Sequence, residues 1–434
     1  MSIPEWTRAS RVARRASFGA NGATVDQVVA TGVDTWVTQA LTPGAADPGV
    51  AATPAPSLPP VPPLPDNATQ AQRQERNKLI EQRRDAVETW WLARMLKAKN
   101  PVPERVTFGW HDHWATSASK VRDSRLMLKQ NETLRATGLR SFTDMAHAMV
   151  VDPAMLEWLD GRRNVKGSPN ENLARELMEL FCLGVGGGYS EQDVKEAARA
   201  LTGWRVSDDG SAVLEPKRFD AGAKTVFGKT GPLDAHGLVD LVLAQPAHPR
   251  FLASRWWRQL ASEDAPGRDV IARLVAAYGP GRDSRALLRA LLLDPGFVAA
   301  RGTLVLAPVD WLVGSARALG VPATDATVTE IKKALRQLGQ VPLQPPNVAG
   351  WPHGAAWLST ASAQTRAAVA QRLVKAADIR AVADQPAAQR VDAAVHLLGL
   401  PSVTARTRDA MNAAGGRPAD LVATLLISPD YLVV

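Results

Sequence analysis

A helix-length stretch in the middle of the chain, residues 171–183, carries two glutamates on one polar face. Glu176 and Glu179 lie three residues apart, so on a helix of about 3.6 residues per turn they are neighbours. Asn172 and Arg175 fall on the same strip, opposite an apolar stripe. Two carboxylates beside an arginine and an amide can hold a divalent metal or share a proton. The alternative is a solvated surface whose ion pairs contribute little.

Two histidines that are two residues apart, His111 and His113, could complete such a site. Residues at this spacing on a regular helix point about 200° apart, so both cannot bind one metal unless the helix ends or kinks there. We therefore expect His113 to bind a metal with Glu176 and Glu179, and His111 to act with these glutamates in proton transfer. Such a set suits hydrolysis or oxidation assisted by one divalent transition metal. The alternative for each histidine is a satisfied, partly buried core residue.

Tryptophans and arginines could line a cleft around this cluster, because the chain has 13 tryptophans against 3 tyrosines. The loop at 344–359 carries two of them and His353 among prolines and glycines. It is either a wall of a cleft or a rigid plug packed on the body, and the plug is favoured. Glu104 and Arg105 either orient the histidines or form an ordinary surface pair. The substrate-binding candidates are Asn172, Arg175, Arg105, Trp110, Trp204, Trp351 and Trp357.

The loop before the central helix, residues 160–167, is basic and rich in turn residues. It leads into a helix N-terminus, which attracts negative charge. Arg162, Arg163 and Lys166 are therefore predicted to bind a phosphate, sulfate or carboxylate.

Helices must position these residues. Ser168 followed by Pro169 and Glu171 is a capping-box start for the central helix, and the glycines from Gly184 onward end it. Residues 205–229 indicate one small β-hairpin at most. The fold class is therefore mainly α, a single body of many helices. Other stretches with helical spacing are 7–19, 24–41, 68–97, 103–118, 122–138, 141–151, 153–159, 235–320 and 361–434.

A proline-rich segment divides the chain near its start. Nine prolines lie between positions 43 and 65, and such a composition cannot bury enough apolar surface to order itself. We expect an N-terminal helical pair at 1–42, a linker at 43–67 and the main α-helical body at 68–434.

The amino-acid composition indicates a globular protein and argues against several kinds of partner and site. The 434 residues are 45% hydrophobic and 22% charged, which is typical of a globular protein. The net charge of +8 is spread out without a run of five or six basic residues, so a nucleic-acid partner is not expected. The one cysteine, Cys182, excludes an internal disulfide and a cysteine-based zinc site, and it is expected to be a free structural thiol.

The sequence contains no apolar run of the roughly 18 residues that a membrane span needs. Its first 20 residues also lack the apolar core of a signal peptide. A cytoplasmic location is therefore expected, or an exported one if a leader has been removed.

Long and specific motifs lie in five segments of the chain, at 13–20, 104–117, 152–172, 169–204 and 344–359. These motifs resemble the bacterial family catalogued as domain of unknown function 1800. The resemblance implies a mostly helical protein without an established activity, frequent export, and a partner from the family catalogued as domain of unknown function 1501. Relatives usually carry a His-Asp pair after the central helices, whereas this chain has Asp220 and no nearby histidine. The motifs are ARRASFGA at 13–20, ERVTFGWHDHWATS at 104–117, DPAMLEWLDGRRNVKGSPNEN at 152–172, the segment from Pro169 to Trp204, and QPPNVAGWPHGAAWLS at 344–359.

These observations favour an uncharacterised metal-assisted hydrolase or oxidase that uses a His/Glu cluster in a basic, tryptophan-lined cleft. The alternative is a non-catalytic binding or accessory protein whose cleft holds a glycan, an anion or a partner chain.

Overall fold

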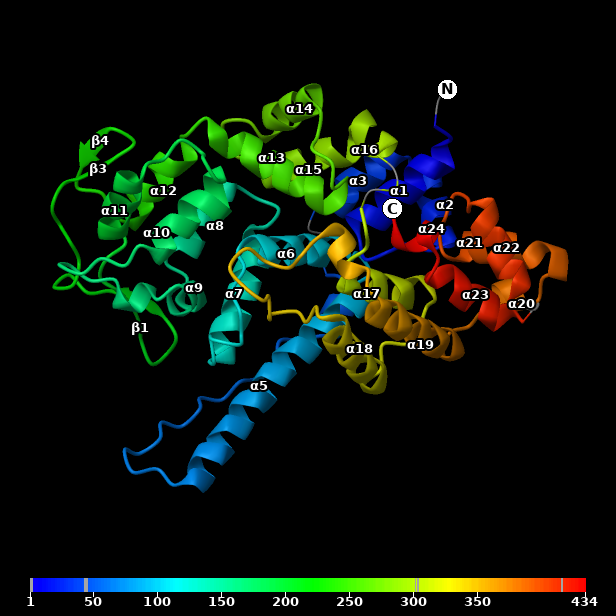
Figure 1. The fold of residues 1–434 in the computed structure, drawn as a ribbon, viewed down its shortest axis with the longest axis horizontal. Helices are drawn as coiled ribbons and strands as arrows, with labels where there is room; N and C mark the ends of the chain where they lie inside the picture. Colours follow the sequence, from blue (N-terminus) through cyan, green and yellow to red (C-terminus); the bar gives the residue numbers. More distant parts are fainter. Residues whose placement is uncertain (1–2, 43–45, 301, 303, 415–416) are drawn as a thin grey trace.

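Helices make up most of the computed structural model, which describes residues 3–42, 46–300, 302, 304–414 and 417–434. They pack into one body (Figure 1), so the prediction of a mainly α fold is confirmed. Among the described residues, none of the helices is both long and apolar enough to span a membrane.

The N-terminal helices are α1 (Glu5–Ala16), α2 (Gly22–Thr31) and α3 (Val33–Ala40). The stretch predicted as one helix over 24–41 is divided, because Gly32 has a φ of 83° that a helix cannot contain. α3 packs on α15 (Ser284–Leu293), far along the chain. The division into segments 1–42, 43–67 and 68–434 stays a prediction.

Helix α5 (Gln70–Lys97) follows a short helix, α4 (Pro48–Ala51), and a stretch of extended chain. It begins with a capping box formed by Thr69 and Gln72. Its first half projects from the body beside the proline-rich segment (Figure 1), whereas its second half buries Trp91 and Leu92 completely. Of the predicted linker, residues 43–45 lie outside the described residues, and residues 54–65 form neither helix nor strand.

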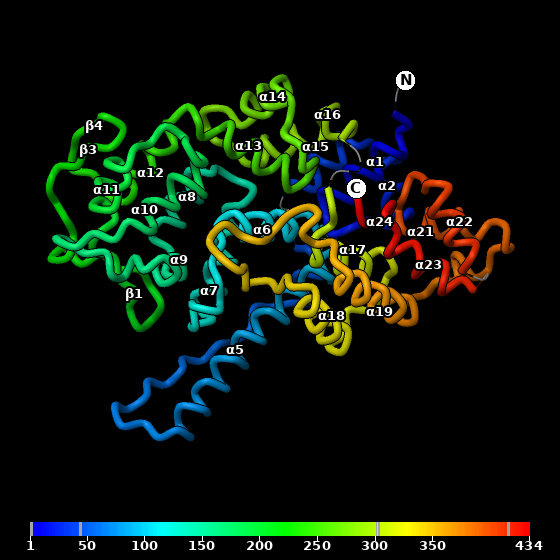
Figure 2. Tube along the Cα trace, viewed as in Figure 1, coloured from blue at the N-terminus to red at the C-terminus, as the bar shows by residue number. Residues whose placement is uncertain are grey.

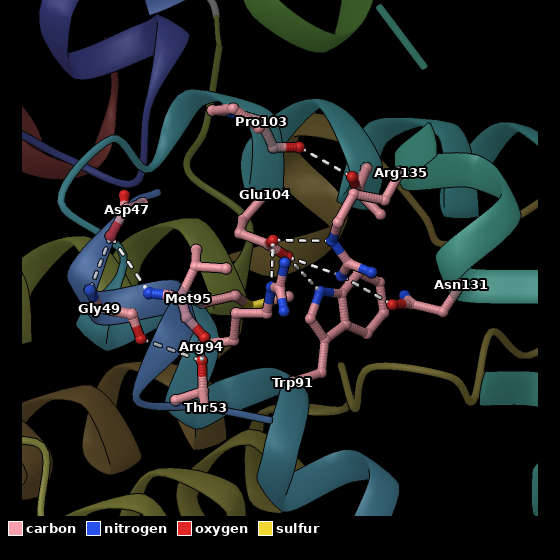
Figure 3. Close-up of polar contacts among 12 residues, drawn as sticks. Asp47, Gly49, Thr53, Trp91, Arg94, Met95, Pro103, Glu104, Asn131 and Arg135 are labelled. Carbon is pink, nitrogen blue, oxygen red and sulfur yellow. Dashed lines mark hydrogen bonds and ion pairs between the residues drawn. The ribbon is translucent and has the colours of Figure 1, made fainter. Parts of the chain in front are cut away.

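The first turn of α6 is fixed by a buried carboxylate, Glu104 (Figure 3). Its oxygens accept hydrogen bonds from Trp91 Nε1 (3.0 Å), Arg94 Nε (2.7 Å) and Arg135 Nε (2.8 Å). Burial by itself raises the pKa of Glu104, but Arg135 and Arg94 outweigh it and lower the pKa. Glu104 therefore pairs with α5 and α7, and not with Arg105. The helices of this region are α6 (Val102–His113), α7 (Ser124–Thr137), α8 (Phe142–Val150) and α9 (Pro153–Trp158).

The central helix begins as α10 (Asn172–Glu176) and continues as the π-helix η2 (Leu177–Leu183) before Gly184 ends it. Its last carbonyls are satisfied by two buried imidazoles: His113 Nε2 lies 2.8 Å from Phe181 O, and His248 Nδ1 lies 3.0 Å from Cys182 O. α11 (Glu191–Ala200) follows and begins with a capping box formed by Ser190 and Asp193.

Two small antiparallel hairpins follow where the sequence indicated one at most. β1 (Trp204–Val206) pairs with β2 (Ala212–Leu214), and β3 (Lys224–Val226) pairs with β4 (Lys229–Gly231). Each strand has three residues, which is too short for apolar alternation to reveal it.

The core consists of two apolar clusters, and α6 contributes to both. Val106 and Trp110 belong to the cluster shared with α1–α3 and α10–α15, whereas Phe108 belongs to the cluster of α5 and α17–α24. Figure 2 accordingly places α6 at the centre of the molecule. The remaining helices are α12 (Ala235–Leu243), α13 (Ala247–Leu260), α14 (Arg268–Tyr278), α16 (Pro295–Ala299), α17 (Pro308–Ala318), α18 (Asp325–Leu338), α19 (Thr360–Ala376), α20 (Arg380–Ala383), α21 (Arg390–Leu397), α22 (Ala405–Ala413), α23 (Pro418–Leu426) and α24 (Pro429–Leu432), with short turns η1 (Gly161–Arg163), η3 (Gly354–Trp357) and η4 (Ala387–Gln389).

Candidate functional site

The glutamates of the central helix do not meet the histidines of α6. Glu176 and Glu179 are half-buried, and Glu179 accepts a hydrogen bond from Tyr189 Oη at 3.1 Å. His113 instead contacts Phe181 O on the buried side of the same helix, where burial lowers its pKa well below the usual value. Among the described residues, no group of three or more His, Cys, Asp or Glu side chains could hold a metal ion. The predicted His113–Glu176–Glu179 group is therefore not formed.

The other polar residues of the central helix form surface contacts. Arg175 pairs with Glu171 at 3.0 Å and with Glu191 at 2.7 Å. Asn172 is exposed. These contacts match the alternative of a solvated face, because they lie at a surface where ion pairs add little stability.

His111 is a core residue. Its ring meets Trp91 and Trp351 edge to face, with centroid distances of 5.4 and 5.5 Å. Burial lowers the pKa of His111 to about 3, so the ring is neutral at pH 7. Trp110 is also fully buried, with its Nε1 donating to a backbone carbonyl, and Trp204 is half-buried on β1.

The basic loop before the central helix lies at the surface. Arg162, Arg163 and Lys166 are exposed, and Arg162 pairs with Glu157 at 3.0 Å. Glu171 stands at the N-terminus of α10, so an acidic side chain occupies the position where the sequence predicted an anion.

A cleft between α1, α6, α13, α17 and the loop at 344–359 gathers the charged groups that the central helix does not. Its cavity volume of about 70 Å³ is several times what one water needs, so it fits a small molecule or ion. Four arginines, three carboxylates and one histidine line it: Arg14, Arg15, Arg105, Arg258, Asp112, Asp310, Glu263 and His353.

Three of the motifs described above converge on this cleft. They lie at 13–20, 104–117 and 344–359 in the chain, and each supplies lining residues. Glycines permit the close approach. A Cβ built on Gly19 would lie 2.8 Å from Gly314 Cα of α17, and one on Gly350 would lie 2.4 Å from Asp112 Oδ1.

Asp112, which stands between the two histidines of α6, links two walls of the cleft. Its Oδ1 accepts the backbone N–H of Trp351 at 2.9 Å, and its Oδ2 accepts from Gln259 Nε2 at 3.3 Å. His353 Nε2 lies 3.8 Å from Asp112 Oδ2, which is too far for a direct hydrogen bond. One oxygen atom about 2.8 Å from each would fit beside this pair and bond to both.

The pKa values of two groups in the cleft, His353 and Asp310, are shifted toward the neutral forms of these side chains. Burial, together with the charges of Arg258 and Arg255, lowers the pKa of His353, although Asp112 opposes this shift. Burial and the nearby Asp112 raise the pKa of Asp310, although Arg105 lies 2.8 Å from its Oδ1. A neutral imidazole beside carboxylates can accept a proton from a ligand or return one.

Several buried polar atoms of the lining have no hydrogen-bond partner within the described protein. They are Gln259 Oε1, Glu263 Oε1, Trp351 Nε1, His353 Nε2 and Asp310 Oδ1, the last of which has only its ion pair with Arg105. A buried polar atom that lacks a partner costs about 1–3 kcal/mol, so native proteins rarely leave one unsatisfied. Their concentration around one cavity indicates that a ligand or ordered water completes them.

Gly350 sets the distance between the loop and α6, and its replacement tests that arrangement. Gly350→Ala is expected to destabilise the protein by about 1–3 kcal/mol more than Gly228→Ala, because its Cβ collides with Asp112. Gly228 is the matched control: its φ of 71° is as unfavourable for alanine, but no atom lies within 4 Å of the added Cβ. Urea unfolding of both variants measures the difference, and equal losses would show that the loop is not held this closely.

The structure brings part of the predicted site into the cleft. Arg105, Trp351 and Trp357 line it, and Trp351 also stacks on Phe108 at 5.3 Å, so the loop is both plug and wall. The sequence analysis did not select Arg14, Arg258, Asp112, Asp310 or His353. The sequence held a signal for two of them only: Asp112 stands between two histidines, and His353 lies in the tryptophan-bearing loop at 344–359.

Asp220, where relatives usually have an adjacent histidine, lies away from the cleft lining. It pairs with Arg199 at 2.8 Å and accepts the backbone N–H of Gly222. These contacts hold the segment between the two hairpins.

Nearly the whole chain matches one protein family. A family model described as "Protein of unknown function (DUF1800)" matches residues 11–433. The comparisons with curated proteins and with solved structures gave no match.

Proposed function

The chain belongs to the DUF1800 family of proteins of unknown function, and we propose that it binds a small anion in the cleft and can exchange a proton with it. The observation that carries this proposal is the set of charged and unpaired polar atoms around one small cavity. The resemblance supplies no reaction, so the proposal rests on the cleft.

The charge of the lining favours a negative ligand. Its four arginines outnumber its three carboxylates. Arg14 and Arg258 have few internal partners: Arg14 Nη2 lies 3.4 Å from Tyr431 O, and Arg258 Nε lies 3.4 Å from Glu263 Oε2. Arg15 instead donates to the carbonyls that end α13, and Arg105 pairs with Asp310. Arg14 and Arg258 are therefore the arginines proposed to hold the anion.

Asp112 and His353 support the acid–base part of the proposal. Both lie at the cavity, and their 3.8 Å separation allows one ligand oxygen to contact both. This pair replaces the His/Glu cluster as the proposed chemical centre.

Removing one arginine tests the binding proposal. Arg14→Gln and Arg258→Gln are each expected to weaken binding of inorganic phosphate about tenfold or more, because each removes a charge-assisted hydrogen bond. Arg250→Gln, which changes an exposed arginine of α13 outside the lining, is expected to leave binding unchanged. Isothermal titration calorimetry measures the three affinities. If all three variants bind alike, or if the parent protein binds none of phosphate, sulfate, glycolate and acetate, the proposal is wrong.

A partner from the family catalogued as domain of unknown function 1501 also stays a proposal. It is supported only by the resemblance, and co-purification from cells that express both chains would test it. A glycan ligand is the weaker alternative, because the tryptophans at the cleft, Trp351 and Trp357, are buried against the body.

A further inference from the structure

The unpaired atoms of the cleft are mainly hydrogen-bond acceptors, although its net charge attracts anions. Gln259 Nε2 donates to Gly109 O at 3.1 Å and to Asp112 Oδ2 at 3.3 Å. Two acceptors on one side fix the orientation of this amide, so Gln259 Oε1 is the atom left without a partner. Glu263 Oε1 is also buried without a partner.

Asp112 adds further accepting capacity at the same place. A carboxylate offers about four lone-pair positions and no donor. Trp351 N–H and Gln259 Nε2 occupy one position on each oxygen, so the remaining positions can accept a hydrogen bond from a ligand. Among the unpaired lining atoms named above, Trp351 Nε1 can only donate, whereas His353 Nε2 donates or accepts according to which ring nitrogen carries the hydrogen.

We propose that the natural ligand is an oxyanion that carries its own O–H group, and that Asp112 accepts the hydrogen bond from this group. Two classes share this chemistry, a protonated phosphate group and a hydroxy acid. This inference rests on the proposed anion-binding function and specifies the ligand. An anion without an O–H, such as sulfate or acetate, presents only oxygen lone pairs to the acceptor oxygens of Asp112, Glu263 and Gln259. These oxygens therefore repel it. A ligand O–H converts the same contacts into charge-assisted hydrogen bonds.

The position of His353 is consistent with this ligand. One oxygen beside both Asp112 Oδ2 and His353 Nε2 can donate its hydrogen to the first and remain near the second. The other charged groups around His353 are Arg255, Arg258 and Glu263. Of these, Arg258 lines the cleft and is one of the two arginines proposed to hold the anion.

The test compares two matched pairs of anions on the parent protein at pH 7 and constant ionic strength. Phosphate is expected to bind at least about tenfold more tightly than sulfate if the ligand is a phosphate, and glycolate at least about tenfold more tightly than acetate if it is a hydroxy acid. Either preference supports the inference and identifies the class. Equal affinities within both pairs would overturn it while leaving anion binding intact. No binding of any of the four would overturn the proposed function itself.

Asp112→Asn tests the residue assignment. Its amide can donate where Asp112 only accepts, so sulfate or acetate is expected to bind more tightly and the preference to fall to less than about threefold. Arg14→Gln is the control, since it removes charge without changing the acceptors and should weaken both members of a pair alike. If Asp112→Asn keeps the parent protein's preference for the anion with an O–H, a group other than Asp112 accepts that hydrogen bond. The parent ratios stand as a test even if this variant fails to fold.

Discussion

Replacing Glu104 by glutamine is expected to reduce the free energy of unfolding by about 3–5 kcal/mol, the usual cost of breaking a buried ion pair from one side. The carboxylate is 2% exposed and lies within 2.8 Å of nitrogens of both Arg94 and Arg135. A neutral glutamine leaves these two arginines without a counter-charge in the interior, and it loosens α6 from α5 and α7. Urea unfolding at pH 7 measures the change.

Glu132 provides the matched control, because it pairs with the same Arg135. Its carboxylate lies 2.9 Å from Arg135 Nη1, but its side chain is 45% exposed. Glu132→Gln should therefore cost less than about 1 kcal/mol. Similar losses in the two variants would contradict the view that burial of Glu104 determines its contribution.

Replacing His111 by phenylalanine is expected to make the protein more resistant to acid. The pKa of His111 is about 3 in the folded protein, whereas a solvated histidine has a pKa near 6.5. Between these values the unfolded chain binds a proton that the folded chain does not, so stability falls as pH decreases from about 6.5. Phenylalanine keeps the packing between Trp91 and Trp351 and removes this proton.

Between pH 7 and pH 4.5 the His111→Phe variant should lose about 3 kcal/mol less unfolding free energy than the parent protein. Acids whose pKa is raised by burial, such as Asp152 and Asp310, also contribute to the pH dependence of unfolding. Their contribution cancels in the comparison, because both proteins contain them. At pH 7 the two proteins should differ little, since His111 Nε2 has no hydrogen-bond partner to lose. An identical pH dependence of unfolding in both proteins would show that His111 is solvated in the folded state.

Local sequence signals predicted much of the fold. Gly184 ends the central helix as the sequence predicted, and the helical stretches predicted between residues 68 and 159 overlap α5 to α9. These features depend on hydrogen bonds between residues three or four positions apart, which a sequence displays directly. The capping box predicted at Ser168 is not formed: α10 begins at Asn172, and its N-cap residue Glu171 makes no side-chain cap. The type of the central helix was not predictable, because the π-helical carbonyls are met by His113 and His248 from distant segments.

The candidate site was predicted only in part, for the same reason. Periodicity identified the polar strip with Glu176 and Glu179, but it could not show that this strip lies opposite the side that meets α6. The sequence analysis predicted His113 as a metal ligand and His111 as a group for proton transfer, although both are buried in aromatic packing.

The sequence by itself therefore determined the helical class, the approximate positions of several helices and the loop that bears Trp351 and Trp357. Only the tertiary structure decided that Asp112 meets His353, 241 positions later in the chain, beside arginines from α1 and α13. Helix propensity and capping act over a few residues, whereas a cleft forms where distant segments pack, and that packing depends on the summed burial of both apolar clusters.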